Sequence, residues 1–245
     1  MAAEQGLLEV ETEALELDAR YGHLEAEAIV ELAIERFRDA GGIATISSFG
    51  ADSAALLHMV ASVDSSLPVV FLDTGQHFGE TLEYRDQLVE DLGLTDLQIV
   101  HPRQETLLAR DPDAKLHESD PDQCCEMRKV EPMTRAVEPY AAWFTGRKRY
   151  QSTTRTKMPV FEAGGPRIRI NPLAPWTTGD QAAYLRAHNL RENPLVAFGY
   201  FSIGCFPCTE PVKPGEDPRS GRWAGRAKTE CGIHLPGLEE LTNAA

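Results

Sequence analysis

The sequence predicts an α/β protein with a parallel, twisted β-sheet flanked by helices. Short apolar runs typical of buried strands alternate along the chain with segments whose apolar residues recur every three or four positions. Strand–helix–strand units of this kind form right-handed crossovers, which make neighbouring strands parallel. Ligands of such sheets bind beyond the carboxyl ends of the strands, so the turns that follow the strands are the first candidates for a functional site.

Each element is predicted from its own local pattern. An amphipathic helix is predicted over about residues 26–40 and ends at Gly41-Gly42. Strands are predicted at residues 43–47, 68–72, 97–100 and 141–145, with a short one at 168–170. Further helices are predicted after residue 54, over 80–92, from about residue 124, and over about 180–188 after the capping oxygens of residues 177–180.

The chain length and composition predict one main domain with short extensions. The 245 residues, 42% of them hydrophobic, are enough for one sizeable core. We expect an acidic helical segment at residues 1–40, an α/β domain at 41–210 and an ordered but mobile tail at 211–245, with residues 111–123 as a surface connection. The first residues lack the basic and apolar regions of a signal peptide, and no stretch approaches the roughly 18 apolar residues of a membrane span. A soluble, cytoplasmic protein is therefore expected.

Charge is unevenly distributed along this chain, whose net charge is −14. The first 40 residues are strongly acidic, but between Arg128 and Arg169 ten Lys and Arg residues face only three Glu residues. A net negative charge disfavours nucleic acid as a partner, whereas a basic island in an acidic protein suits a small anionic ligand. A solvated basic face is the alternative interpretation of the same run.

Two of the turns after predicted strands have the composition of anion-binding loops. Residues 47–53 place serines and a glycine where a strand turns into a helix, so backbone N–H groups and the helix dipole can converge on an anion. Their spacing is neither G-x-x-x-x-G-K-[ST] nor G-x-G-x-x-G. Residues 73–75 follow the next strand and would line the same crevice. A plain strand-to-helix turn with a capping serine is the alternative.

The five cysteines divide into a set of four and a single residue. A Cys-x-x-Cys pair with two more cysteines is typical of a structural zinc site. Side chains of consecutive helical residues diverge by about 100°, which fits the separate iron corners of an iron–sulfur cubane better than one ion. Iron–sulfur is therefore favoured, with zinc as the alternative. The candidate ligands are Cys124, Cys125, Cys205 and Cys208.

The single cysteine, Cys231, is a candidate nucleophile. It lies in a polar, glycine-bearing segment with Lys228 and His234 close in sequence. Exposure and cationic neighbours favour the thiolate, which is the reactive form. A leftover surface cysteine is the alternative. The odd number of cysteines in a chain without a secretion signal argues against a disulfide framework.

Taken together, these segments resemble the assimilatory sulfonucleotide reductases, specifically the iron–sulfur adenylyl-sulfate (APS) reductases, over about residues 43–235. The resemblance implies a nucleotide-binding domain at residues 41–210 that is adenine-nucleotide α-hydrolase-like, of the PP-loop ATP pyrophosphatase type. The motifs that carry it are Ser48-Phe49-Gly50-Ala51-Asp52-Ser53, Leu72-Asp73-Thr74-Gly75, Cys124-Cys125-x-x-Arg128-Lys129, Thr145-Gly146-Arg147-x-x-x-Gln151-Ser152-x-x-Arg155, Cys205-x-x-Cys208, Arg219-x-Gly221-Arg222-Trp223 and Glu230-Cys231-Gly232-x-His234.

The resemblance implies a reaction and a role for individual residues. Cys231 would attack APS, form an S-sulfocysteine and be resolved by a reduced thioredoxin or glutaredoxin-type partner, yielding sulfite and AMP in sulfate assimilation and cysteine biosynthesis. The four remaining cysteines would hold a [4Fe–4S] cluster, with Lys129 between cluster and substrate. The substrate-binding residues would be Ser48, Phe49, Gly50, Asp52, Ser53, Leu72, Asp73, Thr74, Gly75, Lys129, Gly146, Arg147, Arg155, Arg219, Arg222 and His234.

Three other functions stay open at this point. Family members that use the 3′-phosphorylated substrate (PAPS) generally lack the four cluster cysteines, so the resemblance favours APS over PAPS. An ATP-dependent adenylyltransferase, such as a tRNA-thiolating enzyme, would be expected to carry Ser-Gly-Gly-x-Asp-Ser, where this chain has Phe49-Gly50-Ala51. A zinc-stabilised binding module would not need Cys231. Residues 148–150 receive no role beyond added positive charge, and the sequence leaves open whether the chain forms a homo-oligomer.

Overall fold

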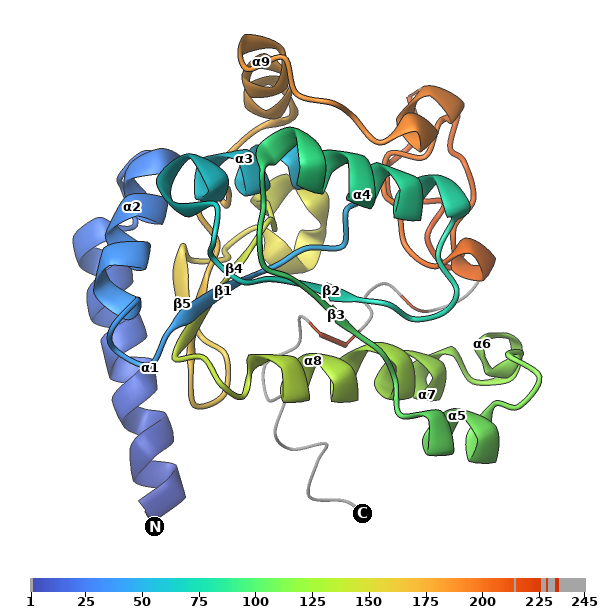
Figure 1. The fold of residues 1–245 in the computed structure, drawn as a ribbon, viewed down its shortest axis with the longest axis horizontal. Helices are drawn as coiled ribbons and strands as arrows, with labels where there is room; N and C mark the ends of the chain where they lie inside the picture. Colours follow the sequence, from blue (N-terminus) through green and yellow to red (C-terminus); the bar gives the residue numbers. More distant parts are fainter. Residues whose placement is uncertain (1, 214, 226–227, 229–231, 234–245) are drawn as a thin grey trace.

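The computed structural model describes residues 2–213, 215–225, 228 and 232–233. Within them, a six-stranded sheet has the order β3-β2-β1-β4-β6-β5, and every pair of neighbours is parallel except β5 and β6 (Figure 1). The predicted fold class, a mostly parallel sheet flanked by helices, is confirmed. The strands are β1 (Ile43–Ile46), β2 (Val69–Leu72), β3 (Leu97–Val100), β4 (Ala142–Thr145), β5 (Phe161–Ala163) and β6 (Ile168–Ile170).

Alternate residues of the central strands face opposite sides of the sheet, as the two-residue period of a strand requires. On β2, Val69 and Phe71 belong to one buried cluster, whereas Val70 and Leu72 belong to another. Both clusters are apolar because helices cover both faces, which explains why the strands consist of continuous apolar runs.

The two layers of helices are visible on either side of the sheet in Figure 1. Helices α2 (Ala26–Phe37), α3 (Ser53–Asp64) and α4 (Gly79–Leu92) pack on the first face, and α8 (Glu131–Val137) packs on the second. The other elements are the helices α5 (Gln104–Arg110), α6 (Leu116–Ser119), α7 (Pro121–Cys125) and α9 (Thr178–Ala187), the π-helical η1 (Glu126–Val130), and the short 3₁₀ turns η2 (Arg149–Gln151), η3 (Thr153–Arg155), η4 (Pro194–Phe198) and η5 (Phe206–Cys208).

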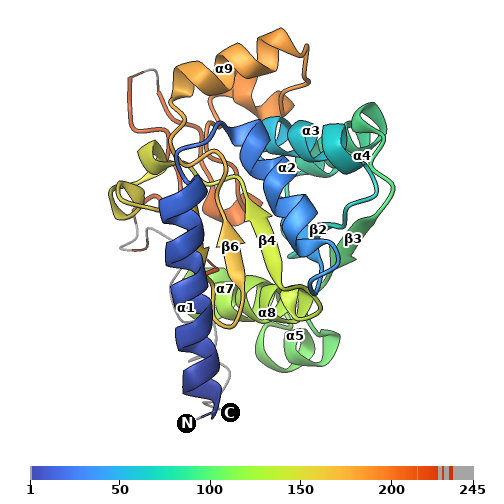
Figure 2. The same cartoon turned by 90° about the vertical axis from the view of Figure 1, so that its left-hand side faces the viewer.

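The acidic N-terminal segment has a structural role that its composition did not indicate. Helix α1 (Ala2–Tyr21) contacts β5, and it runs along the β6 side of the sheet in Figure 2. The Asp18 carboxylate accepts hydrogen bonds from the backbone N–H groups of Val160 and Phe161, at 2.7 and 3.0 Å. These N–H groups lie at the edge of the sheet, where strands otherwise present unpaired backbone groups. Helix α1 therefore covers and closes this edge.

Several elements differ from the expectations of the sequence. Strand β5, which has only three residues, and its antiparallel pairing with β6 were not expected. The connection at 111–123 contains α6 and the start of α7, and Asp111 within it is buried. Part of the expected tail packs against the body: Val212 and Trp223 are buried, and the backbone N–H of Trp223 donates to the Cys208 carbonyl at 3.0 Å.

Among the helices of the described residues, none has the length and apolar character needed to cross a bilayer.

Candidate active site

A cavity of about 480 Å³ lies at the carboxyl ends of β1, β2 and β4. Strand β1 is central, and the chain continues to β2 on one side of it while β4 lies on the other. This reversal of strand order separates the connecting loops and leaves a crevice, which is where ligands bind in open α/β sheets. The structure brings together, as lining residues, the predicted Ser48, Gly50, Asp52, Ser53, Leu72, Thr74, Lys129, Gly146, Arg147, Arg155, Arg219 and Arg222.

The loop after β1 makes a tight turn that is fixed from both sides. The Ser47 hydroxyl accepts a hydrogen bond from the Phe49 N–H at 3.2 Å, and the Asn193 side-chain amide donates to the Phe49 carbonyl at 3.0 Å. Phe49 has a φ of +48°, and its ring is fully buried in an edge-on contact with Phe71, 5.7 Å between centroids. The predicted site residue Phe49 therefore anchors the loop in the core, while Ser48 and Gly50 line the cavity.

Helix α3 begins directly at the cavity. Its N-cap residue Asp52 makes no side-chain capping hydrogen bond, although Asp is a favoured capping residue. The first-turn N–H groups of a helix have no partner within the helix and carry the positive end of its dipole. The loop and the start of α3 can thus offer backbone N–H groups to an anion.

The turn after β2 connects the cavity to the cysteines. The Asp73 carboxylate accepts a hydrogen bond from the Gly75 N–H at 2.9 Å, and Gly75 has a φ of +71°, which favours glycine. Thr74 is buried with its hydroxyl 3.3 Å from the Cys205 Sγ. Asp73 and Gly75 thus shape the turn, and Thr74 lies between the cavity and Cys205.

A buried ion pair ties this turn to the segment that follows the adjacent cysteines. The Arg128 guanidinium donates to the Thr74 carbonyl at 2.7 Å and to the Asp111 carboxylate at 2.6 Å, and both charged side chains are almost fully buried. Arg128 lies in η1, where the Glu131 N–H donates to the Glu126 carbonyl five residues back. Insertions of this π-helical kind occur frequently at functional sites. Arg128 therefore holds the turn, and its neighbour Lys129 lines the cavity.

The segment after β4 supplies buried positive charge. Arg147 is almost fully buried, donates to the Asn171 side chain at 3.0 Å and pairs with Glu162. Arg155 is also buried and donates to the Gln151 side chain at 2.8 Å. Burial and, secondarily, the charge of Arg155 lower the pKa of the neighbouring Arg169 to about 10. Positive charges held this close in a poorly solvated wall favour an anion in the cavity.

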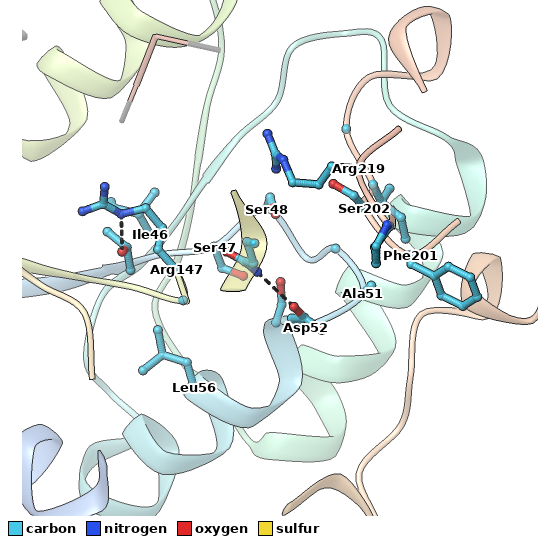
Figure 3. Close-up of a pocket in the computed structure, with 18 of the residues that line it drawn as sticks. Ile46, Ser47, Ser48, Ala51, Asp52, Leu56, Arg147, Phe201, Ser202 and Arg219 are labelled. Carbon is cyan, nitrogen blue, oxygen red and sulfur yellow. Dashed lines mark hydrogen bonds between the residues drawn. The ribbon is translucent and has the colours of Figure 1, made fainter. Parts of the chain in front are cut away.

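Two more arginines approach from the C-terminal segment. Arg219 and Arg147 lie on opposite sides of Ser48 in the close-up of the cavity (Figure 3). The Arg222 guanidinium stacks over the Trp223 ring at 4.4 Å. A Cβ atom added to Gly204 would lie only 2.4 Å from an Arg222 side-chain nitrogen, so glycine leaves the room that this guanidinium occupies. Positive groups from three separate segments therefore meet at one cavity.

The four predicted metal-ligating cysteines gather beside this cavity. Cys124 and Cys125 end α7, Cys205 directly precedes η5, and Cys208 is the last residue of η5. Cys208 is half-buried and the other three are buried. Burial, reinforced by the three other thiols, raises the pKa of Cys124 to about 12. Burial acts to raise the pKa of Cys205 as well, but Lys129, Thr74 and Arg222 together lower it.

The set is chemically suited to a group bound by thiolates. The charges of the four sulfurs influence one another, as expected for thiols that lie close together. Lys129 and Arg222 favour the thiolate of Cys205, which is the form that binds a metal. Within the described part of the chain, no three Cys, His, Asp or Glu side chains already surround a single ion position. The predicted nucleophile Cys231 and the predicted His234 lie outside the described residues, although Ile233 lines the cavity.

The structure also adds residues that the sequence did not single out. Lys148 is completely buried beside Asp52, and Gln181 from α9 lines the cavity. His77 lines it too, and burial lowers the pKa of this imidazole. The basic run suggested Lys148, but only the approach of the β1 and β4 loops shows which carboxylate it meets. No local pattern indicated Gln181 or His77.

Comparison with known proteins agrees with this geometry. Residues 42–211 match the phosphoadenosine phosphosulfate reductase domain family. A Chelativorans protein named adenosine 5′-phosphosulfate reductase is 78% identical over the full length of both chains. A Mesorhizobium japonicum protein of the same name is 64% identical, covering 96% of this chain and 93% of its own.

A solved structure extends the agreement to three dimensions. The phosphate complex of phosphoadenylyl-sulfate (PAPS) reductase from Candida auris has a TM-score of 0.68 and 26% identity, covering 81% of this chain and 96% of its own. The resemblance predicted from the motifs is confirmed at the level of the family. The chain belongs to the phosphoadenosine phosphosulfate reductase domain family, the sulfonucleotide reductases.

Proposed function

We propose that this protein is an adenylyl-sulfate reductase that converts APS to sulfite and AMP at the expense of a thioredoxin-type dithiol. The observation that carries the proposal is one cavity in which an anion-binding loop, arginines from two segments and a lysine next to the cysteine set converge. The names of the two close relatives support APS as the substrate.

The binding part of the proposal follows from charge. APS carries its negative charge at the phosphosulfate end, which would lie against the Ser48–Ser53 loop and the start of α3, between Arg147, Arg155, Arg219 and Arg222. The adenosine would lie toward Leu72 and Thr74 at the end of β2. The same positive groups would stabilise the charge that gathers on the phosphate as the bond to sulfur breaks, which is electrostatic stabilisation of the transition state.

The chemical part assigns the nucleophile to Cys231. Its thiolate attacks the sulfur of APS, the bond from that sulfur to the bridging oxygen breaks, and the electron pair leaves with AMP. Cys231 then carries an SO₃ group as S-sulfocysteine. A thiolate of the reduced partner attacks the Cys231 sulfur and expels sulfite, and its second thiol resolves the mixed disulfide. The partner supplies both electrons and leaves as a disulfide, while Cys231 returns to the thiol.

The resident cofactor in this proposal is a [4Fe–4S] cluster held by Cys124, Cys125, Cys205 and Cys208. The thiols come from two segments, and adjacent helical cysteines suit separate iron corners. When bound, such a cluster would tie α7 to η5 and supply a charged group beside Lys129. Lys129 itself lines the cavity and lowers the pKa of Cys205, so this lysine would lie between the cluster and the substrate.

Sulfite release from APS and from PAPS, measured side by side with reduced thioredoxin, tests this function. We expect turnover with APS at least about tenfold more efficient in kcat/KM than with PAPS, a difference of about 1.4 kcal/mol or more in transition-state binding. Omitting thioredoxin is the control: it should allow at most one AMP to be released per chain and no release of sulfite. Equal or greater efficiency with PAPS would make the 3′-phosphorylated compound the substrate. If neither compound yields sulfite, the protein is not a sulfonucleotide reductase.

A further inference from the structure

The carboxylate of Asp52 is held by a cap of donors from the loop after β4. Its Oδ2 atom accepts hydrogen bonds from the Lys148 ammonium at 3.3 Å, the Tyr150 hydroxyl at 3.3 Å and the Gln151 side-chain amide at 3.0 Å. Lys148 is 0% exposed and also donates to the Gly146 carbonyl at 3.2 Å. A fully buried lysine is rare in proteins unless its charge is paired.

The position of Asp52 makes this arrangement informative. Asp52 lines the cavity with its side chain 31% exposed and stands at the start of α3 beside Ser47 and Ser48 (Figure 3). A bare carboxylate there would repel an anionic ligand at the point where the helix N-terminus would attract it. Burial lowers the pKa of Lys148, whereas the charge of Asp52 and its hydrogen bond act to raise that pKa, so the carboxylate opposes the loss of the lysine charge.

We propose that Lys148 is a positioning residue that masks the charge of Asp52, so that the anion-binding loop presents only its N–H groups and positive side chains to the nucleotide. Lys148 does this from the adjoining strand end, and it thereby also fixes the distance between the β1 and β4 loops, which form two walls of the cavity. The inference deepens the proposed function and rests on an anionic nucleotide as the ligand.

Binding of AMP to the full-length protein, measured by calorimetry, tests charge masking. Lys148→Met keeps the length of the side chain and removes its charge, so we expect AMP to bind at least about tenfold more weakly. In Lys148→Met combined with Asp52→Asn, no charge needs masking, and we expect the affinity to return to within about threefold of wild type. Such a return separates charge repulsion from lost packing, because double-mutant cycles isolate the coupling between two side chains.

Arg149→Met is the matched control, because it removes a positive charge from the same loop. Arg149 donates to the Met158 carbonyl at 2.9 Å, away from Asp52. Its variant should bind AMP within about threefold of wild type. If Lys148→Met does not fold, the double variant still decides, since it leaves no unpaired buried charge.

Wild-type affinity in Lys148→Met would overturn the proposal, as would a double variant at least about tenfold weaker than wild type, which would show direct contact between Lys148 and the ligand. The sulfite assay separates this inference from the proposed function. If the variants bind AMP in the expected order but the wild-type protein releases no sulfite, charge masking holds and the reductase function is wrong. If the protein releases sulfite but Lys148→Met binds AMP as wild type does, the reductase function holds and charge masking is wrong.

Discussion

Cys231→Ser is expected to lower sulfite release from APS by at least about a thousandfold, the largest effect of any single substitution in this chain. A serine hydroxyl is hardly ionised at neutral pH, so it is a far poorer nucleophile than a thiolate. Chemistry adds a second barrier: an oxygen that captured the SO₃ group would form a sulfate ester, which contains no sulfur–sulfur bond for a dithiol to reduce. The measurement is sulfite release with thioredoxin in excess.

Binding to the same variant shows whether the loss is chemical. AMP affinity should change by no more than about twofold, since the charged groups that line the cavity belong to other residues. A fall in kcat without a matching fall in nucleotide binding identifies an interaction made only in the transition state. Turnover by the serine variant above about a tenth of the wild-type rate would mean that another group attacks the sulfur.

Cys205→Ser is expected to remove most of the bound iron and to reduce sulfite release by about a hundredfold or more. Loss of one thiolate leaves three ligands, and Cys205 is the one whose sulfur contacts Thr74 and whose charge interacts with Lys129, both of which line the cavity. Weakening a metal site usually costs at least one to two orders of magnitude in affinity or activity. Iron per chain and the visible absorption of the purified protein are the direct readouts.

Cys231→Ser serves as the matched control for this substitution, because it too replaces one thiol by a hydroxyl. Cys231→Ser should retain the wild-type iron content. A loss of iron in Cys205→Ser alone would distinguish the four cluster ligands from the single nucleophile. Zinc in the purified wild-type protein in place of iron, or equal iron loss in both variants, would contradict the division of the five cysteines.

The helical layers and five of the six strands could be predicted because each carries a local pattern of apolar residues. Val69–Leu72 is a continuous apolar run between two layers of helices, and its pattern gives both the strand and the parallel sheet. Strand β5 carries no such signal, because it has three residues and depends on α1 and on pairing with β6. The burial of Asp111 could not be predicted from the sequence either, since it depends on a salt bridge to Arg128, 17 residues away.

The candidate site could be predicted in composition but not in its internal pairing. Motifs placed Ser48, Thr74 and Arg147 at strand ends, and parallel topology then brings strand ends together. The same motifs gave Phe49 a place at the ligand, whereas its ring is in the core. Lys148 was only one charge in a basic run, because the carboxylate that it meets is 96 residues away. Contacts between distant loops depend on tertiary structure, and no local spacing encodes them.

The account depends most on a covalent intermediate at Cys231, and mass spectrometry of the wild-type protein after incubation with APS alone tests it most directly. We predict one SO₃ group for each AMP released, located on the peptide that contains Cys231 and removed as sulfite when reduced thioredoxin is added. An SO₃ group on any of the four other cysteines, or sulfite formation with thioredoxin by a protein that never carries the group, would contradict the account.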